Sequence, residues 1–257
     1  MALLREGSLE SNAQAVALLG SAAAEDVPVA HHLLGMLAES GGAGTTDYTE
    51  AAARYKRAAE LGHVPAQVRY GFALLHGRGT EPDAFTAETW LRRAATAGDV
   101  QAAAVVGYLY AREGELPPNH AEAAIWFERA AQGGHAGAAR MLGHMLLFGT
   151  GLAKNVPEAV HWLRFAAAQG DETARASLIH LALMRQVGED DQREAAVWLE
   201  QAAAAGSAEA SFHLGLCLAQ GIGVEQNLPA ALHWICRAAE AAHPNAVRML
   251  RQSAAEE

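Results

Sequence analysis

Apolar residues recur along the chain at a helical spacing, and the pattern repeats every 36 residues. In each repeat an alanine is followed, four and seven positions later, by further apolar residues, so the three side chains share one stripe of a helix. We call this predicted helix the A helix. Its alanine and the residue four positions later are Ala30 and Leu34, Ala66 and Tyr70, Ala102 and Val106, Ala138 and Leu142, Ala174 and Leu178, Ala210 and Leu214, and Ala246 and Leu250.

A second amphipathic helix, the B helix, is predicted after each A helix. All five tryptophans lie on it, 36 residues apart, at Trp90, Trp126, Trp162, Trp198 and Trp234. The period predicts a B-type lead helix over residues 9–26, six A–B hairpins over 27–242 and a final A-type helix over 243–257. The expected fold is all-α, a right-handed superhelix (solenoid) of hairpins. It forms one domain over residues 1–257, because no segment is left for a second.

The ends of the predicted B helices carry residues that start and stop helices. Side chains that accept hydrogen bonds from free amides are expected to act as N-caps, each contributing about 1 kcal/mol. Glutamates three positions later predict capping boxes, and glycines at the far end predict left-handed stops. The N-caps are Asp47, Asp83, Asn119, Asn155, Asp191 and Asn227; the glutamates are Glu50, Glu122, Glu158 and Glu194; the stops are Gly62, Gly98, Gly134, Gly170 and Gly206.

Three copies carry a Gly-x-Gly turn between their A and B helices, at residues 77–79, 149–151 and 221–223. The turn follows a helix rather than a strand and lacks a phosphate-binding lysine, so we interpret it as structural rather than nucleotide-binding.

The recurring string Ala-x-x-x-Leu-Gly, Gly-x-Gly, Asp/Asn-x-x-x-Ala-x-x-Trp-Leu-x-x-Ala-Ala-x-x-Gly resembles the Sel-one-like repeat (SLR) family, relatives of tetratricopeptide repeats. The resemblance covers nearly the whole chain. It implies a superhelix of antiparallel hairpins, and a role as an adaptor or scaffold rather than as an enzyme. One copy of the string is formed by Ala138, Leu142, Gly143, Gly149, Gly151, Asn155, Ala159, Trp162, Leu163, Ala166, Ala167 and Gly170.

Two copies depart from this string. The fifth has Ile179 where the others have glycine, and Arg185 at the first glycine of the turn. Side chains there are expected to hold the helices apart and change the curvature near residues 179–190. In the first copy Arg54 replaces tryptophan, and Tyr55 is expected to fill part of the lost volume.

In repeats of this kind the A helices line the concave surface, so the residues two before and two after each leucine position are expected to face a groove. Phe72, Tyr108, His144 and His180 are predicted to form a continuous aromatic band that anchors a partner; the alternative is burial of these side chains against each other. Arg69, Arg140 and Arg248 are candidates to pair with acidic groups, with plain solvation as the alternative. The candidate partner-binding residues are His32, Met36, Val68, Phe72, Tyr108, Arg140, His144, His180, Phe212, Leu216 and Arg248, beside Ala104, Ala176 and Gln252.

Composition limits the kinds of partner that the chain can bind and the cellular compartment in which it is expected. A net charge of −10, from 19 basic and 29 acidic residues, opposes nucleic-acid binding. No apolar run is long enough to span a bilayer, and the first residues do not resemble a signal peptide. The two cysteines, Cys217 and Cys236, are too few for a disulfide scaffold and are expected to point apart. We therefore expect a cytoplasmic chain that is monomeric alone.

The histidines and the recurring residues suggest no chemistry beyond binding. Twelve histidines occur, but equivalent positions on neighbouring hairpins lie too far apart to share a metal, so we expect no metal or other cofactor and no catalytic residue. The leading hypothesis is an adaptor that holds a segment of a partner protein in its groove. The alternatives are a small-ligand or cell-wall-fragment binding protein or hydrolase that uses the groove as a pocket, and a self-assembling structural protein.

Overall fold

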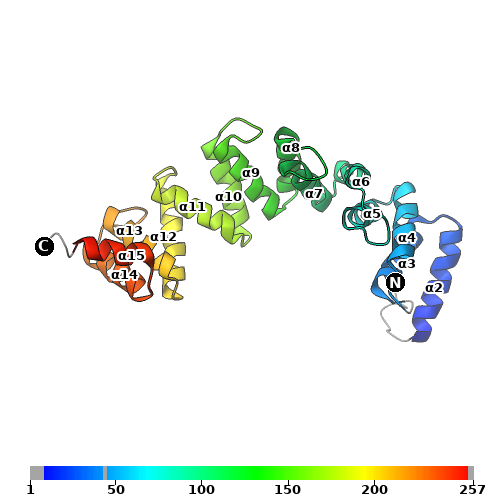
Figure 1. The fold of residues 1–257 in the computed structure, drawn as a ribbon, viewed down its shortest axis with the longest axis horizontal. Coiled ribbons are helices and arrows are strands. Elements are labelled where there is room, and N and C mark those ends of the chain that lie inside the picture. Colours follow the sequence, from blue (N-terminus) through cyan, green and yellow to red (C-terminus); the bar gives the residue numbers. More distant parts are fainter. Residues whose placement is uncertain (1–8, 43–44, 254–257) are drawn as a thin grey trace. The chain divides into compact units, whose positions relative to one another are not determined.

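The structure of the protein is a computed structural model, which describes residues 9–42 and 45–253. These residues form fourteen helices and no strand, arranged as alternating A and B helices (Figure 1). The predicted all-α fold of tandem hairpins is thereby confirmed. The lead helix is α2 (Leu9–Ala24). The A helices are α3 (Pro28–Ser40), α5 (Val64–His76), α7 (Val100–Ala111), α9 (Ala136–Phe148), α11 (Glu172–Leu183), α13 (Ala208–Gln220) and α15 (Pro244–Ser253); the B helices are α4 (Tyr48–Glu60), α6 (Ala84–Thr96), α8 (His120–Gln132), α10 (Val156–Ala168), α12 (Glu189–Ala204) and α14 (Leu228–Glu240).

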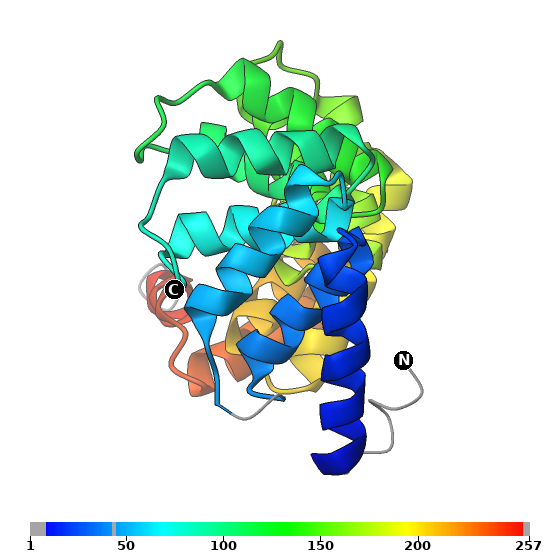
Figure 2. The same cartoon turned by 90° about the vertical axis from the view of Figure 1, so that its right-hand side faces the viewer.

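Contacts between residues divide the chain into two compact units. Unit 1 contains the residues up to 138 together with 150–152, and unit 2 contains residues 139–149 together with those from 153 onward. Within unit 1, consecutive helices from α2 to α8 pack side by side in chain order (Figure 2). The expectation of one domain over the whole chain stays a prediction. Residues 1–8, on which the signal-peptide prediction rests, and 254–257, the end of the predicted final helix, lie outside the described residues.

A glycine in the middle of helix A lets helix B approach closely. A Cβ atom at Gly71 would lie 2.7 Å from Cγ of Leu91, the residue that follows the tryptophan on the facing helix. The same relation joins Gly107 to Phe127 and Gly215 to Ile235. In the first hairpin Tyr55 takes this place against Gly35 and is buried. That it fills the volume lost with the tryptophan at Arg54 stays a prediction. In the hairpins that have this glycine, a large side chain of helix B therefore packs directly against the backbone of helix A.

The second glycine of each Gly-x-Gly turn has a different role. Gly79 and Gly223 adopt φ angles of +72° and +67°, and a Cβ on them would lie 1.9 Å and 2.0 Å from backbone oxygens at the start of the preceding B helix. The turn thus packs against the neighbouring hairpin through backbone alone, which requires glycine. The structural interpretation of this turn agrees with the geometry.

Five of the six predicted N-caps form. Asp83, for example, accepts a hydrogen bond from the Thr86 amide at 3.0 Å, and Asn119 from the Glu122 amide at 3.1 Å. The amide of each N-cap residue donates back to a carbonyl of helix A, as from Asp83 to Leu74 at 3.0 Å. The other three that form are Asp47, Asn155 and Asn227.

The predicted capping boxes are wrong, because the bond from the glutamate side chain back to the N-cap amide does not form. At Asp47, Asn119 and Asn155 the N-cap amide that a box would need is already bonded to helix A, so the glutamates have other partners. The fourth box fails because Asp191 is not an N-cap. Glu122 accepts from the Trp126 indole N–H and from Arg92, both at 2.9 Å, and Glu50 accepts from Arg54 at 2.7 Å.

The fifth hairpin departs from the repeat, and the predicted N-cap Asp191 is wrong. Helix α12 begins at Glu189 after Gly188 and has 16 residues, whereas the other B helices of the hairpins have 13. Three acidic side chains then fall in its first turn, where they complement the helix dipole. Asp191 instead pairs with Arg164 at 3.0 Å.

The expected loosening at Ile179 is also seen. Helices α11 and α12 pack less closely than the α3–α4, α5–α6, α7–α8 and α13–α14 pairs. Arg185 adopts the left-handed conformation with φ +54° that glycine takes at Gly77 and Gly221. The change in curvature stays a prediction.

Left-handed residues stop the B helices as predicted. Gly62, Gly98, Gly134, Gly170 and Gly206 have φ angles between +87° and +99°. Asp26 and Ala242 take the same place at the ends of α2 and α14, with φ +56° and +59°. Among the described residues, no helix has the length and apolar character that crossing a membrane requires.

Candidate functional site

The predicted groove residues of unit 1 differ in how accessible they are. Met36 is 40% exposed, Val68, Phe72 and Tyr108 are half-buried, and Ala104 is buried. His32 packs between the rings of His63 and Tyr55, with ring centroids 4.7 Å and 5.7 Å away. Burial, followed by the nearby His63, lowers the pKa of His32 to about 4, so this imidazole is neutral at physiological pH.

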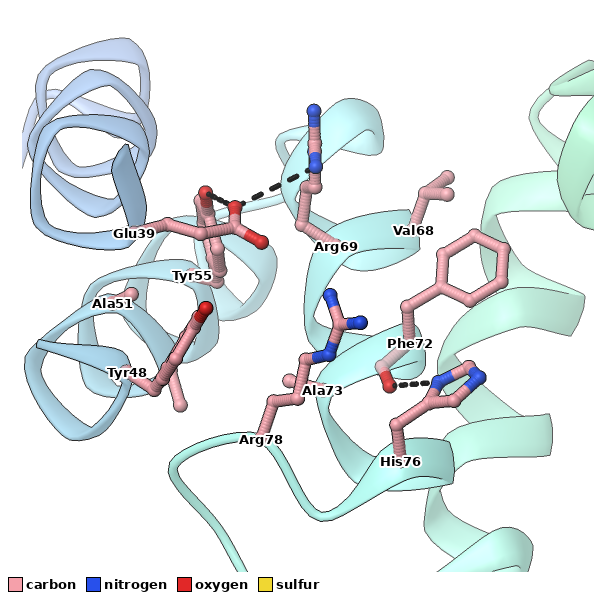
Figure 3. Close-up of a pocket in the computed structure, with 11 residues that line it drawn as sticks. Glu39, Tyr48, Ala51, Tyr55, Val68, Arg69, Phe72, Ala73, His76 and Arg78 are labelled. Carbon is pink, nitrogen blue, oxygen red and sulfur yellow. Dashed lines mark hydrogen bonds and ion pairs between the residues drawn. The ribbon is translucent and has the colours of Figure 1, made fainter. Parts of the chain in front are cut away.

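Val68 and Phe72 line a pocket between α3, α4 and α5, with a volume of about 320 Å³ (Figure 3). The B helix contributes Tyr48 and Tyr55, and alanines of α4 and α5 also line the pocket. Arg78, from the Gly-x-Gly turn that follows α5, also lines the pocket. Two predicted groove residues, Val68 and Phe72, thus line this pocket together with side chains that were not predicted to bind a partner.

The polar groups of this pocket are only partly paired. One carboxylate oxygen of Glu39 accepts from the Tyr55 hydroxyl at 2.6 Å and lies 3.5 Å from Arg69 Nη1 (Figure 3). Burial, and then this bond to Glu39, raises the pKa of Tyr55, so the phenol stays protonated and donates. The guanidinium of Arg78 makes no hydrogen bond or ion pair with any residue in the described part of the chain.

In unit 2 several predicted groove residues are bonded within the protein. Arg140 pairs with Asp171 at 3.0 Å, and His144 Nε2 lies 2.9 Å from the Ser177 hydroxyl. Burial lowers the pKa of His144, with Arg140 as a second cause. Phe212 is 8% exposed and stacks on His243 with centroids 4.6 Å apart.

The remaining predicted residues of unit 2 are more open. His180 and Arg248 are exposed, and Arg248 donates to the Asn245 side chain at 3.0 Å. Leu216 is half-buried, and Ala176 and Gln252 are exposed. Arg140 and Arg248 are thus bonded to neighbours on this chain, and their pairing with acidic groups of a partner stays a prediction.

The predicted aromatic band does not form as ring contacts within either unit, as far as the described residues show. Phe72 contacts His76 and Tyr108 contacts Phe127 on its own hairpin, at 6.1 Å and 5.0 Å. His144 contacts Phe148 at 6.4 Å rather than His180. Phe72 and His144 each pack with the ring four positions later on their own helix, because the turn of the helix brings such residues together. Tyr108 packs with a ring of the B helix in its own hairpin.

Two large exposed side chains on this face were missed by sequence reasoning. Phe148 is 76% exposed and Met184 is 57% exposed. They occupy the same repeat position, 36 residues apart, and follow His144 and His180 by four residues, hence on the same helix face. That shared spacing was the signal available in the sequence. Within each unit we use the name A-helix face for its predicted groove residues, and in unit 2 the name also includes Phe148 and Met184.

A second pocket, of about 540 Å³, lies between α11, α12 and α13 in unit 2. Ile179, Leu183 and Trp198 form its apolar wall, and Glu172, His180, Glu209 and His213 lie around it. Arg175 covers the Trp198 ring at 5.5 Å and pairs with Glu172 at 2.6 Å. This pocket lies at the hairpin in which Ile179 replaces glycine.

In the described part of the chain, side chains able to bind a metal or act as nucleophiles are dispersed. No group of three histidine, cysteine or acidic residues is placed to hold a metal ion among the described residues. Cys217 is buried, which raises the pKa of its thiol to about 11, and Cys236 is half-buried. The thiol of Cys217 is therefore neutral at physiological pH.

Tandem hairpins of alternating A and B helices, without a strand among the described residues, define a helical repeat protein. A family model described as Sel1 repeat matches residues 28–63, 64–99, 100–135, 136–171, 176–207 and 208–243, so the chain belongs to the Sel1 repeat family. Proteins of this family are generally interaction scaffolds and typically not enzymes.

Two solved structures illustrate the likeness. A protective antigen present in uropathogenic Escherichia coli strains, displaying an SLR fold, is 28% identical with a TM-score of 0.71, over 90% of this chain and 50% of that chain. A Sel1 repeat protein from Oxalobacter formigenes is 25% identical with a TM-score of 0.59, over 95% of this chain and 81% of that one. The chain thus spans half the length of the first protein. No match was found among the curated proteins.

Proposed function

We propose that this chain is an adaptor that binds a segment of a partner protein along its A-helix face. The observation that carries the proposal is the exposure of Phe148 and Met184, two large apolar side chains at one repeat position of unit 2. Burying such side chains against a partner removes apolar area from water and contributes about 25 cal/mol per Å².

The pockets support the same proposal. Each compact unit has a pocket with an apolar wall on or beside this face, next to half-buried groups such as Phe72 in unit 1 and Trp198 in unit 2. Pockets that accept one or two side chains are typical anchor points within a larger protein interface. A partner segment would need only a few such anchors, with the remaining contacts excluding water.

The proposal is tested by partner capture from cells of the source organism with three forms of the chain. The wild type is compared with Phe148→Ser/Met184→Ser on the A-helix face. The control is Val197→Ser/Leu232→Ser, which removes apolar side chains that are 49% and 55% exposed on B helices of the same unit. Because all four side chains are exposed, we expect every form to fold, as circular dichroism can verify.

We expect the wild type and the B-helix control to recover the same proteins, identified by mass spectrometry. The A-helix variant should lose those that bind through this face. Recovery of the same proteins by all three forms would remove the A-helix face from the interaction. A loss only in the B-helix control would transfer the binding surface to the opposite helices.

A further inference from the structure

The pocket between α3, α4 and α5 differs in charge from the rest of the molecule. The chain carries a net charge of −10, yet the charged side chains around this pocket are Arg69, Arg78 and a single carboxylate, Glu39. Glu39 is already engaged by Tyr55 and Arg69. The pocket is therefore a site of locally positive charge on an acidic protein, which selects for negative groups.

Neither arginine is part of the repeat. The residues at the position of Arg69 in the other complete copies are Leu33, Val105, Met141, Ser177 and His213. Those at the position of Arg78 are Gly42, Gly114, Thr150, Gln186 and Ile222. Packing of the hairpin thus does not call for an arginine at either place. The two guanidinium groups occur together in one repeat, beside one pocket.

Backbone geometry holds Arg78 at the pocket. It lies between Gly77 and Gly79, whose φ angles are +63° and +72°, and its amide donates to the Ala73 carbonyl at 2.9 Å. Gly79 in turn is seated on the backbone at Tyr48. Figure 3 shows the side chain extending from this turn back toward α5. The base of the side chain is therefore fixed, while its guanidinium is exposed and has no partner among the described residues.

The second half of the pocket is apolar. Val68 and Phe72 of α5 and Tyr48 of α4, which is 46% exposed, border the same space of about 320 Å³. Such a volume lies at the lower end of the range for ligand pockets, about 300–1,000 Å³. An arginine fork binds a carboxylate through two parallel hydrogen bonds, whereas the aromatic and aliphatic side chains favour an apolar group.

We propose that this pocket binds a carboxylate together with a neighbouring apolar side chain from an extended partner segment. The carboxylate pairs with Arg78, with Arg69 beside it, and the apolar side chain lies against Val68 and Phe72. This inference rests on the proposed function, because it names the chemistry of one anchor of a bound partner. A side-chain carboxylate and the carboxylate at a chain end have the same chemistry, and the experiment separates them.

The experiment measures fluorescence anisotropy of short labelled peptides with the full chain. The first probe has a Leu-Glu-Phe core and an amidated C-terminus. The second has Leu-Gln-Phe, which keeps the shape and removes the charge. The third has Leu-Gln-Phe at a free C-terminus, so that its only carboxylate is the terminal one. The protein variants are Arg78→Gln, Arg69→Gln and Arg112→Gln.

Arg112 provides a matched control, because it is exposed in the same unit, lies outside the pocket and has no ion pair among the described residues. We expect the wild type and Arg112→Gln to bind one of the carboxylate probes about tenfold more tightly than the neutral one, as a charge-assisted hydrogen bond predicts. Arg78→Gln should lose that preference, and Arg69→Gln should weaken it. Added salt should reduce it.

Equal binding of all three probes by the wild type, including no binding of any, would overturn the inference, as would an unchanged preference in Arg78→Gln. Tighter binding of the first probe assigns a side-chain carboxylate, and tighter binding of the third assigns a chain end. Failure here is separable from failure of the proposed function. Partner capture through Phe148 and Met184 concerns unit 2, and its result does not depend on Arg78.

Discussion

The α5–α6 hairpin of unit 1 and the α11–α12 hairpin of unit 2 occupy equivalent places in the repeat but pack differently. In the first, Gly71 leaves bare backbone on which Leu91 is seated. In the second, Ile179 stands at the glycine position, the helices pack less closely, and a pocket of about 540 Å³ adjoins them. The hairpin with isoleucine at this position thus packs less closely than the hairpin with glycine, and it has space beside it for another group.

The two hairpins also differ at their turns. Gly77 and Gly79 allow a turn in the left-handed region, from which Asp83 begins α6 as an N-cap. In α11–α12 only Arg185 takes this conformation, and α12 begins early, at Glu189 after the N-cap Gly188. The regular repeat packs without Ile179 or Arg185. Positions where a copy departs from the repeat can therefore carry binding chemistry that is specific to this chain.

The largest expected effect comes from truncating the residue that seats helix B on helix A. Leu91→Ala removes a fully buried side chain and should lower the free energy of unfolding by about 2–5 kcal/mol. Leu199→Ala, the equivalent change in α12, should cost less, because the looser hairpin can collapse around the change. Urea unfolding, with hydrogen exchange to locate the affected hairpin, checks the order. Equal losses would show that both hairpins pack alike.

A smaller effect is expected from adding a methyl group to the close contact. A Cβ at Gly71 would lie 2.7 Å from Leu91, so Gly71→Ala should destabilise by about 1–3 kcal/mol through overpacking. Gly20 in α2 is the matched control, because a Cβ there meets nothing within 4 Å. Gly20→Ala should stabilise by about 0.5–1 kcal/mol, the difference in helix propensity. Thermal and urea unfolding of both variants test the sign, and a stabilising Gly71→Ala would contradict the close packing.

The smallest effect concerns helix starts. Asp83→Ala removes an N-cap that accepts from the Thr86 amide and hydroxyl, and should cost about 1 kcal/mol. Asp191→Ala should cost less, because Asp191 lies inside α12 and pairs with the half-exposed Arg164. High salt should reduce the cost at Asp191 more than the cost at Asp83. A larger loss at Asp191 would indicate that it begins the helix after all.

Most of the fold could be predicted because its determinants are local and repeated. The positions of Trp162 and Leu163 on one helix face, the stop at Gly170 and the N-cap Asn155 each depend on residues within a few positions. Six copies of the same pattern reinforce each other. The isoleucine at position 179, where every other copy has glycine, also predicted the looser packing correctly. Its side chain prevents the close approach of helix B to helix A that the glycine allows.

The candidate site could be predicted only in part. Phe212 lies at a groove position yet is buried by His243, and Ala104 is buried although the pattern places it in the groove. The capping boxes failed because a carbonyl on another helix competes for the same amide. Each failure involves a partner that is distant in sequence, which a periodic pattern does not contain.

The order of helices, their hairpin pairing and the residues that begin and end most of them are properties of the amino-acid sequence by itself, since backbone hydrogen bonding and helix periodicity act over short distances. The tertiary structure alone decided which apolar side chains on the A-helix face stay open, as Phe148 does, and which close over, as Phe212 does. It also brought Arg69 and Arg78 to one pocket with Glu39. Exposure and local charge depend on every neighbour in space, and those neighbours are established only when the hairpins pack.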